Sequence, residues 1–260
     1  MGKNFWQTYQ SLVEPIPESL SIKRCYQNQK WTAVESECGC GLALNFESLD
    51  PEEKKSVEGK SLKEIASWVF SWNFAKASIG AAAVNTFWNQ REPIEKMSNA
   101  SLENLIAKIS IEDFVREKFC GKKILFVGYF PFADVLKKDC KVTILERRSL
   151  AGALPDTACE ALIPEQDLVI VSASTLINKT YVRLAQLSQN VESFLVGPTT
   201  PLTGLLAKDG FNQVSGLIIK DPKLLFEALR SGASREVLQS DISWKIDLNY
   251  KRMTLGSNLK

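Results

Sequence analysis

The pattern of hydrophobic and polar positions changes near residue 100. Before that point, short runs of strand character cover residues 21–27, 31–36 and 42–46, and a turn at Asn28 and Gln29 joins the first two. A helical repeat then occupies residues 62–71 and the alanine-rich residues 75–88, after a polar loop at residues 47–60. This order of strands followed by helices predicts an α+β domain over residues 1–100, with residues 89–101 as a connection.

From residue 101 to residue 260 the pattern alternates between apolar runs and amphipathic segments. The apolar runs predict strands at residues 123–127, 142–145, 168–171, 194–196 and 214–219. The other segments predict helices at residues 111–119, 133–138, 156–162, 179–189, 202–208 and 222–230. Apolar strands that alternate with helices are typical of a parallel sheet covered on both faces, so the second domain is predicted to be α/β. In the tail, the alternation of Ile242, Trp244 and Ile246 predicts either an added strand or a return to the first domain.

Composition narrows the classes of function. The net charge is only +2 and no basic stripe is present, which argues against a nucleic-acid partner. The apolar runs are strand-sized and the first residues lack the apolar core of a signal peptide, so we expect no membrane partner and a cytoplasmic location. The chain has no histidine, which excludes Ser-His-Asp and Cys-His mechanisms and histidine-ligated metals. Its six cysteines are then expected to be reduced thiols.

Ligands of open parallel sheets bind at the carboxyl ends of the strands. The first predicted strand of the second domain ends in 128-GYFPF-132, where a dinucleotide-binding loop would carry more glycines. Phe130 fills the space that a pyrophosphate needs, so ordinary NAD or FAD binding is not expected. Glu146 follows the next strand, where a carboxylate commonly holds a ribose hydroxyl, although a surface ion pair with Arg147 or Arg148 explains it equally well. Together, Gly128 and Glu146 fit an adenosine-like or pterin-like ligand, or a metal complex.

Two further loops at the same edge are rich in hydroxyl groups. In residues 172–178, Ser172, Ser174 and Thr175 are candidates for binding an anion, while Asn178 is predicted to cap a helix beginning at Lys179. In residues 197–201, two prolines stiffen a turn that carries two threonine hydroxyls. Capping and turn formation alone are the simpler interpretation of both loops.

Residues 38–40 have the sequence Cys-Gly-Cys, which resembles a metal-binding or redox motif. Two thiols do not complete a zinc site, and the spacing differs from the Cys-x-x-Cys redox motif. With the predicted turn, Cys25 faces Thr32 and supplies no third thiol. A glycine-rich turn with incidental cysteines is therefore the main interpretation, and capture of a soft metal with help from another loop is the alternative.

In combination, the motifs SWN-x4-SIGAAAVN, VGYFPF, VTILERR, DLVIVSASTLIN and GPTTPL resemble the DUF364 and DUF4213 families. These families are described as "putative heavy-metal chelation" proteins. The resemblance implies an enolase N-terminal-like first domain, a Rossmann-like second domain and a site in the cleft between them. The positions that match the family motifs are Gly128, Phe130, Pro131, Glu146, Thr175, Asn178, Gly197, Pro198, Pro201, Asn73 and Asn85.

The leading hypothesis is a metal-handling protein that holds a heavy-metal ion or, in preference, a metal chelate in this cleft. The alternative is a transferase-like enzyme acting on a nucleotide-like or pterin-like ligand, and a third is a scaffold without a ligand. The sequence leaves three questions open: which cofactor is bound, whether a reaction is catalysed, and whether the chain forms a homo-oligomer. The predicted ligand-binding residues are Gly128, Phe130, Pro131, Phe132, Glu146, Ser174, Thr175, Asn178, Gly197, Pro198, Thr199, Thr200, Asn73 and Asn85, with Glu146, Cys38 and Cys40 as candidate metal ligands.

Overall fold

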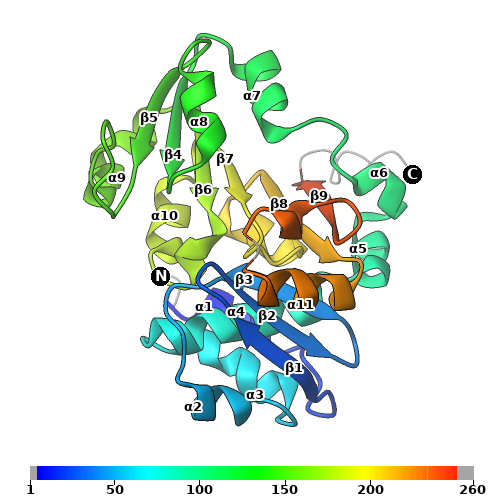
Figure 1. Ribbon diagram of the computed structural model, residues 1–260. Helices are drawn as coiled ribbons and strands as arrows, with labels where there is room; N and C mark the ends of the chain where they lie inside the picture. Colours follow the sequence, from blue (N-terminus) through cyan, green and yellow to red (C-terminus); the bar gives the residue numbers. More distant parts are fainter. Residues whose placement is uncertain (1–4, 233, 251–260) are drawn as a thin grey trace.

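The computed structural model describes residues 5–232 and 234–250, which form a small antiparallel sheet beside a larger, mostly parallel one (Figure 1). The small sheet has the order β1-β2-β3 and the large sheet has the order β5-β4-β6-β7-β8-β9. This is the predicted α/β class, an α+β unit followed by a Rossmann-like one. The strands are β1 Ile22–Gln27, β2 Trp31–Ser36, β3 Cys40–Leu44, β4 Lys123–Val127, β5 Lys141–Leu145, β6 Leu168–Ser172, β7 Glu192–Val196, β8 Gln213–Ile219 and β9 Ser243–Asn249.

Helices pack on one face of the small sheet. They are α3 (Leu62–Ala66), the 3-10 helix η1 (Ser67–Phe70) and α4 (Phe74–Trp88). A Cβ atom at Gly41 of β3 would clash with backbone atoms of Ala82 and Thr86 in α4, and one at Gly80 would clash with the backbone of Val69. The missing side chains at Gly41 and Gly80 therefore allow α4 to pack closely on β3 and on η1.

The predicted register of the first hairpin is wrong. Cys25 pairs with Val34, whereas Gln27 pairs with Thr32. The turn is shifted by one residue, to Gln29 and Lys30: Asn28 N–H donates to the carbonyl oxygen of Trp31, and the Asn28 side chain accepts from Lys30 N–H and Trp31 N–H.

Two short helices lie in segments that the sequence predicts as a polar loop and a connection: α2 (Pro51–Lys55) and α5 (Arg91–Ser98). A third, α6 (Leu102–Leu105), follows in a segment for which no element is predicted. Their hydrophobic signal is weak because α2 buries no residue and α5 buries only Ile94. Pro93 is compatible with α5 because the first-turn N–H groups of a helix have no partner within it.

The five predicted strands of the second domain are confirmed, and β4 to β8 run parallel. β9 adds a sixth strand, antiparallel to β8. From β4 the chain passes to β5 on one side and then to β6 on the other, so the order reverses at the β4–β6 pair. Such a switch point is where ligands of open α/β sheets bind.

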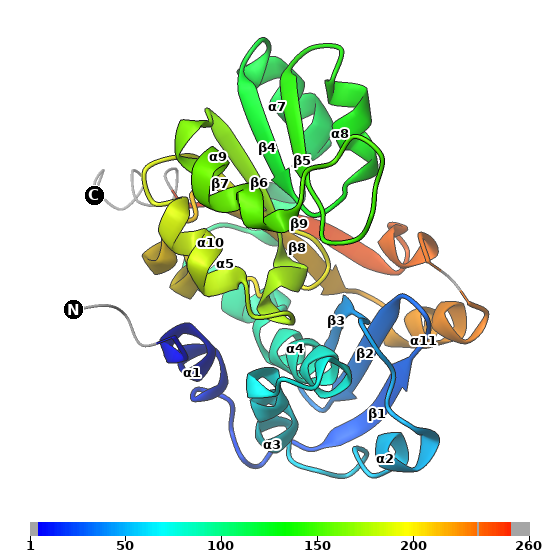
Figure 2. The same cartoon turned by 90° about the vertical axis from the view of Figure 1, so that its left-hand side faces the viewer.

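Helices cover both faces of the large sheet (Figures 1 and 2). On one face, α7 (Ile111–Phe119) and α8 (Pro131–Leu136) pack on Phe126 and its neighbours. On the other face, α10 (Tyr181–Leu187) packs on residues such as Val169 and Leu195. The remaining segments are α1 Gln7–Val13, η2 Asp156–Ala158, α9 Cys159–Leu162, η3 Ile163–Glu165, η4 Ala173–Leu176, η5 Gly204–Asp209, α11 Pro222–Arg230 and η6 Glu236–Leu238.

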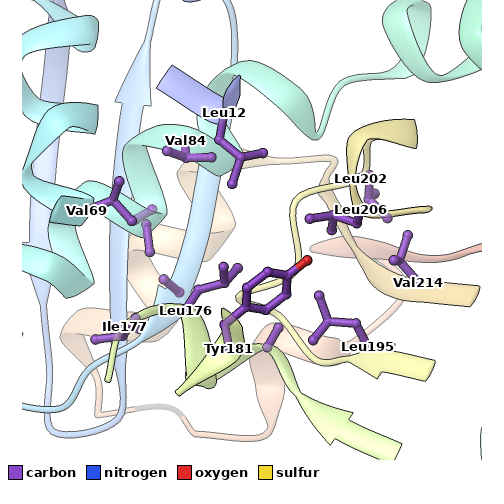
Figure 3. Close-up of a cluster of buried hydrophobic side chains, with 14 of the residues drawn as sticks. Leu12, Val69, Val84, Leu176, Ile177, Tyr181, Leu195, Leu202, Leu206 and Val214 are labelled. Carbon is purple, nitrogen blue, oxygen red and sulfur yellow. The ribbon is translucent and has the colours of Figure 1, made fainter. Parts of the chain in front are cut away.

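The two halves of the chain share hydrophobic cores. Val69 and Val84 of the first half lie in one cluster with Leu195 and Val214 of the large sheet (Figure 3). A second shared cluster joins the small sheet to α11 and β8. The helix α11, near the end of the chain, therefore covers strands from its beginning. No helix of the described part of the chain is long and apolar enough to cross a membrane. The boundary predicted near residue 100 stays a prediction.

Candidate functional site

The carboxyl ends of β4, β6 and β7 point toward the half of the molecule that holds β1 to β3 (Figure 1). At the end of β4, Gly128 has a φ of 96°, a left-handed conformation that favours glycine. A Cβ atom there would lie 3.0 Å from the Cβ of Ser172 at the end of β6. The close approach of these two strand ends therefore depends on the missing side chain of Gly128.

Glu146 braces the loop after β4. Its Oε2 atom accepts a hydrogen bond of 3.1 Å from Tyr129 N–H, and its Oε1 atom accepts one of 3.1 Å from Arg148 N–H. The carboxylate is mostly buried, with 12% of the side chain exposed, and the Arg148 guanidinium lies 3.6 Å away and is 88% exposed. Both carboxylate oxygens thus hold backbone groups, and contact of Glu146 with a ribose or a metal stays a prediction.

Two aromatic residues of the 128–132 loop, Phe130 and Phe132, pack on the sheet. The rings of Phe130 and Phe132 lie 5.8 and 5.6 Å from the ring of Phe126, measured between centroids, and 5.5 Å from each other. Pro131 is the first residue of α8, a position that needs no N–H donor. These contacts give the loop a structural role, while ligand binding by Phe130, Pro131 and Phe132 stays a prediction.

The loop after β6 presents a pair of hydroxyl groups beside Gly128. The Oγ atoms of Ser172 and Ser174 lie 2.8 Å apart, and both residues are half-buried. Thr175 is buried and donates its hydroxyl to the carbonyl oxygen of Ser172 at 2.7 Å. Of the three hydroxyls, those of Ser172 and Ser174 are therefore the ones that solvent or a ligand can reach.

The predicted start of the next helix is wrong. The helix α10 begins at Tyr181, and its N-cap residue Thr180 makes no side-chain capping bond. The Oδ1 atom of Asn178 instead accepts from the backbone N–H and the hydroxyl of Thr180. The reason is that Lys179 has a φ of 68°, which breaks the helical path between Asn178 and Tyr181.

Lys179 is a feature that the sequence analysis missed. It is only 4% exposed, and its Nζ atom donates to the carbonyl oxygen of Ile177 at 2.8 Å and lies 5.7 Å from the centre of the Tyr9 ring. Burial lowers the pKa of Lys179 to about 8. A lysine in a polar loop looks like a surface residue, whereas in the folded protein it is buried and lies near the Tyr9 ring of α1.

The 197–201 turn is occupied by contacts with the first half of the chain. The hydroxyl of Thr199 accepts from Leu44 N–H at 2.9 Å, and Asn85 donates its side-chain amide to the carbonyl oxygens of Leu42 and Pro198. Thr199 and Thr200 are both buried. The turn positions the two sheets.

Two polar atoms of this interface lack a hydrogen-bond partner among the described residues: the Oδ1 atom of Asn85 and the Oγ1 atom of Thr200. A buried atom of this kind is commonly satisfied by water or a ligand. Gly197 of the same turn is half-buried, and a Cβ atom there would meet nothing within 4 Å. Ligand contact by Gly197, Pro198, Thr199, Thr200 and Asn85 stays a prediction.

Asn73 caps α4, because its side chain accepts a hydrogen bond from Lys76 N–H. The capping bond accounts for the residue type. Ligand contact by Asn73 stays a prediction.

The candidate thiols lie at a different place. Cys38 is half-buried and donates a weak hydrogen bond to the carbonyl oxygen of Thr86 at 3.7 Å, while Cys40 is only 3% exposed. Burial raises the pKa of both thiols. Within the described residues, no group of three or more His, Cys, Asp or Glu side chains is placed to hold a metal ion. The side chains therefore do not fit a metal that needs three or four protein ligands.

Comparison with known proteins agrees with this architecture. Residues 111–246 match the model of the DUF364 family and residues 9–87 match that of the DUF4213 family, both described as "Putative heavy-metal chelation". A crystal structure of a DUF364-family protein of unknown function from Desulfitobacterium hafniense is 30% identical, with a TM-score of 0.81 over 94% of this chain and 98% of that one.

Two more distant relatives carry less weight. A DUF364-family structure from Pyrococcus horikoshii, at 20% identity and a TM-score of 0.71 over 94% of this chain and 99% of that one, shows the fold alone. An uncharacterized protein of Methanocaldococcus jannaschii is 29% identical over 147 residues, which are 54% of this chain, and the chain spans about half of that relative, 53% of its length. The family match over most of the large sheet and the full-length likeness to the Desulfitobacterium structure lead to one conclusion: the chain belongs to the DUF364 family, with a DUF4213 region before it.

Proposed function

We propose that this protein binds an anionic metal chelate, a metal already held by a small molecule, at the edge where β4 and β6 diverge. The observation that carries the proposal is that the Glu146 carboxylate is already engaged in hydrogen bonds to the backbone. This carboxylate lies beside the loop after β4, and both of its oxygens hold backbone N–H groups. A metal at this edge would therefore bring its own ligands.

The groups that the edge offers suit the outside of such a complex. The hydroxyls of Ser172 and Ser174 hydrogen-bond to oxygen atoms, and the exposed guanidinium of Arg148 pairs with carboxylates. Gly128 lacks the Cβ atom that would lie 3.8 Å from the hydroxyl oxygen of Ser172. The family description as "putative heavy-metal chelation" supports a metal in the ligand.

The test is thermal unfolding of the purified protein with preformed Ni(II)–citrate and Fe(III)–citrate, each beside the free metal and free citrate. A chelate present at about 100 times its Kd would stabilise the fold by about 2.7 kcal/mol. We expect the unfolding temperature to rise with the preformed metal–citrate complex and not with the free metal or free citrate. Stabilisation by ATP or S-adenosylmethionine alone would favour the transferase-like alternative, and no shift with any compound would favour the scaffold.

Matched variants locate the site. Ser172→Ala with Ser174→Ala, and separately Arg148→Gln, should each weaken chelate binding by about tenfold, because a hydrogen bond to a charged group contributes about 1.5–3 kcal/mol. Arg147→Gln is the control for the arginine, since Arg147 is already paired with Asp156 at 2.8 Å. Ser56→Ala with Ser231→Ala is the control for the serines, because both are exposed and bond only to their own helices. Equal losses in the control variants would contradict the proposed location.

A further inference from the structure

Lys179 is a buried cation directly after the hydroxyl-bearing loop of residues 172–178. It is 4% exposed, and its Nζ atom donates to the carbonyl oxygens of Ile177 at 2.8 Å and Leu176 at 3.5 Å. Both acceptors are neutral, and Lys179 forms no ion pair with any residue that the structure describes. A buried charge is ordinarily paired with an opposite charge, so a buried ammonium group held only by carbonyl oxygens calls for an explanation.

The elements around Lys179 do not neutralise its charge. Their titratable groups are Tyr9 of α1, Tyr181 of α10 and Asp209 of η5. Burial raises the pKa of both tyrosine hydroxyls, so both are neutral at the pH where the lysine titrates. The Asp209 carboxylate accepts from the hydroxyl of Tyr181 at 2.9 Å and from that of Thr8 at 2.8 Å. The counter-charge of Lys179 therefore has to come from a bound molecule.

The ammonium group lies close to the two serine hydroxyls at the sheet edge. Ile177 N–H donates to the carbonyl oxygen of Ser174 at 2.9 Å, so the loop folds back tightly between Ser174 and Lys179. This bond and the bond from Nζ to the Ile177 carbonyl oxygen place the charge within about 10 Å of the Ser174 carbonyl oxygen, given standard backbone dimensions. Across that distance in a protein, one unit charge changes the pKa of another group by about one pH unit. An anion bound at Ser172 and Ser174 would therefore favour the charged form of the lysine.

We propose that Lys179 is the buried charge partner of an anionic ligand at the β4–β6 edge, and that ligand binding is coupled to uptake of a proton by this side chain. The inference rests on the proposed function, which places the anion at Ser172 and Ser174. It requires the bound species to be anionic overall, because a neutral or cationic one would not stabilise the ammonium group. The proton comes from solvent and forms an N–H bond at Nζ, without a change in oxidation state. A purely structural lysine that holds the carbonyl groups of Leu176 and Ile177 predicts no such uptake, since a neutral amine still donates N–H groups.

The experiment is isothermal titration calorimetry in buffers of different ionisation enthalpy, which counts the protons taken up on binding. The probe is Ni(II)–citrate, with free citrate and ATP tested beside it. Burial lowers the pKa of Lys179 to about 8 in the free protein. If the ligand raises this pKa by about one pH unit, about half a proton is taken up per bound chelate at pH 8.5 and less than about a tenth at pH 7. By the same linkage, the affinity should fall about threefold from pH 7 to pH 8.5.

Variants assign the proton to Lys179. Lys179→Met should abolish the uptake and lower the affinity at pH 7 by about tenfold, the factor that corresponds to one pH unit in the pKa. Lys179→Arg keeps its charge at both pH values, so it should bind equally well at pH 7 and pH 8.5 without proton uptake. Lys60→Met is the matched control, because Lys60 is exposed and paired with Glu64 at 2.8 Å, and this variant should keep the uptake of the natural protein.

The outcomes separate this inference from the proposed function. Binding of the chelate without uptake that depends on Lys179 would overturn the inference and leave the proposed function standing. Uptake that depends on Lys179 with free citrate or ATP, and no binding of the chelate, would do the reverse. If none of the three anions binds, both fall. Should the Lys179 variants fail to fold, absence of uptake by the natural protein at pH 8.5 would by itself overturn the inference.

Discussion

The protonation of Lys179 differs from that of a free lysine. Its ammonium group is buried against Tyr9 and is held by the carbonyl oxygen of Ile177. Because burial lowers its pKa to about 8, the folded protein binds this proton less tightly than the unfolded chain does. The charged form therefore destabilises the fold below pH 8, and that penalty disappears as the pH rises toward the ordinary lysine pKa of 10.5.

This linkage predicts a pH dependence that one substitution removes. Between pH 7 and pH 9.5, the free energy of unfolding of the natural protein should rise relative to that of Lys179→Met by on the order of 1–2 kcal/mol. Urea unfolding of both proteins at the two pH values measures it. The comparison cancels the opposite effect of Cys25, whose pKa burial raises to about 12. A constant difference between the two proteins would show that Lys179 titrates normally.

At the scale of elements, the contact between β3 and α4 is set by glycine. Gly41 in the strand faces the backbone of Ala82 and Thr86, and Gly80 in the helix faces the backbone of Val69. The same stretch of α4 carries Asn85 and leads to Asn89. Asn89 donates to the carbonyl oxygens of Thr200 and Leu217 and accepts from Leu202 N–H. Close packing of α4 on the small sheet thus places the amides that join it to the large one.

The close contact makes a specific prediction about Gly41→Ala. The added methyl group meets backbone atoms that cannot rotate away, so we expect a loss of more than about 3 kcal/mol in the free energy of unfolding. Gly204→Ala is the control, since its Cβ atom would meet only the Met97 sulfur at 3.5 Å, an ordinary contact. Chemical denaturation compares them. Equal stabilities would mean that α4 can move away from β3 at little cost.

At the scale of the whole molecule, the two sheets complete each other's cores. The helix α11 follows the last parallel strand but packs on β1 and β2, and its Phe226 is 1% exposed. The Arg24 guanidinium of β1 lies 4.2 Å from the centre of the Phe226 ring. Trp31 of β2 also donates its indole N–H to the carbonyl oxygen of Ser234. The face of the small sheet opposite α4 is therefore covered by residues far along the chain.

Because the cores are shared, loss of α11 packing should weaken both halves. Phe226→Ala is expected to cost about 3–5 kcal/mol, whereas Leu224→Ala on the exposed side of the same helix should cost well under 1 kcal/mol. Hydrogen exchange tests the coupling. Amide protection should fall together in β1–β3 and in β4–β7, and a fall confined to β1–β3 would show that the halves unfold separately.

Much of the architecture follows from the sequence by itself. The apolar runs of the second half predict its parallel strands, and the alanine-rich residues 75–88 predict the helix α4. The glycine after the helix that ends at Phe119 has a φ of 76°, as expected for a helix stop. These features are local: hydrophobic periodicity and glycine positions report which side of a segment is buried, whatever covers it.

Only the tertiary structure decided what the polar residues do. Glu146 holds the Tyr129 backbone, the 197–201 turn bonds to α4 and β3, and Lys179 is buried beneath α1. A carboxylate, a threonine or a lysine has the same local pattern whether it meets solvent, a ligand or another strand. The role of such a residue depends on hydrogen bonds to other segments, and Asn85 and Pro198, which bond to each other, are more than a hundred residues apart. Hydrophobic periodicity within one segment carries no information about such partners.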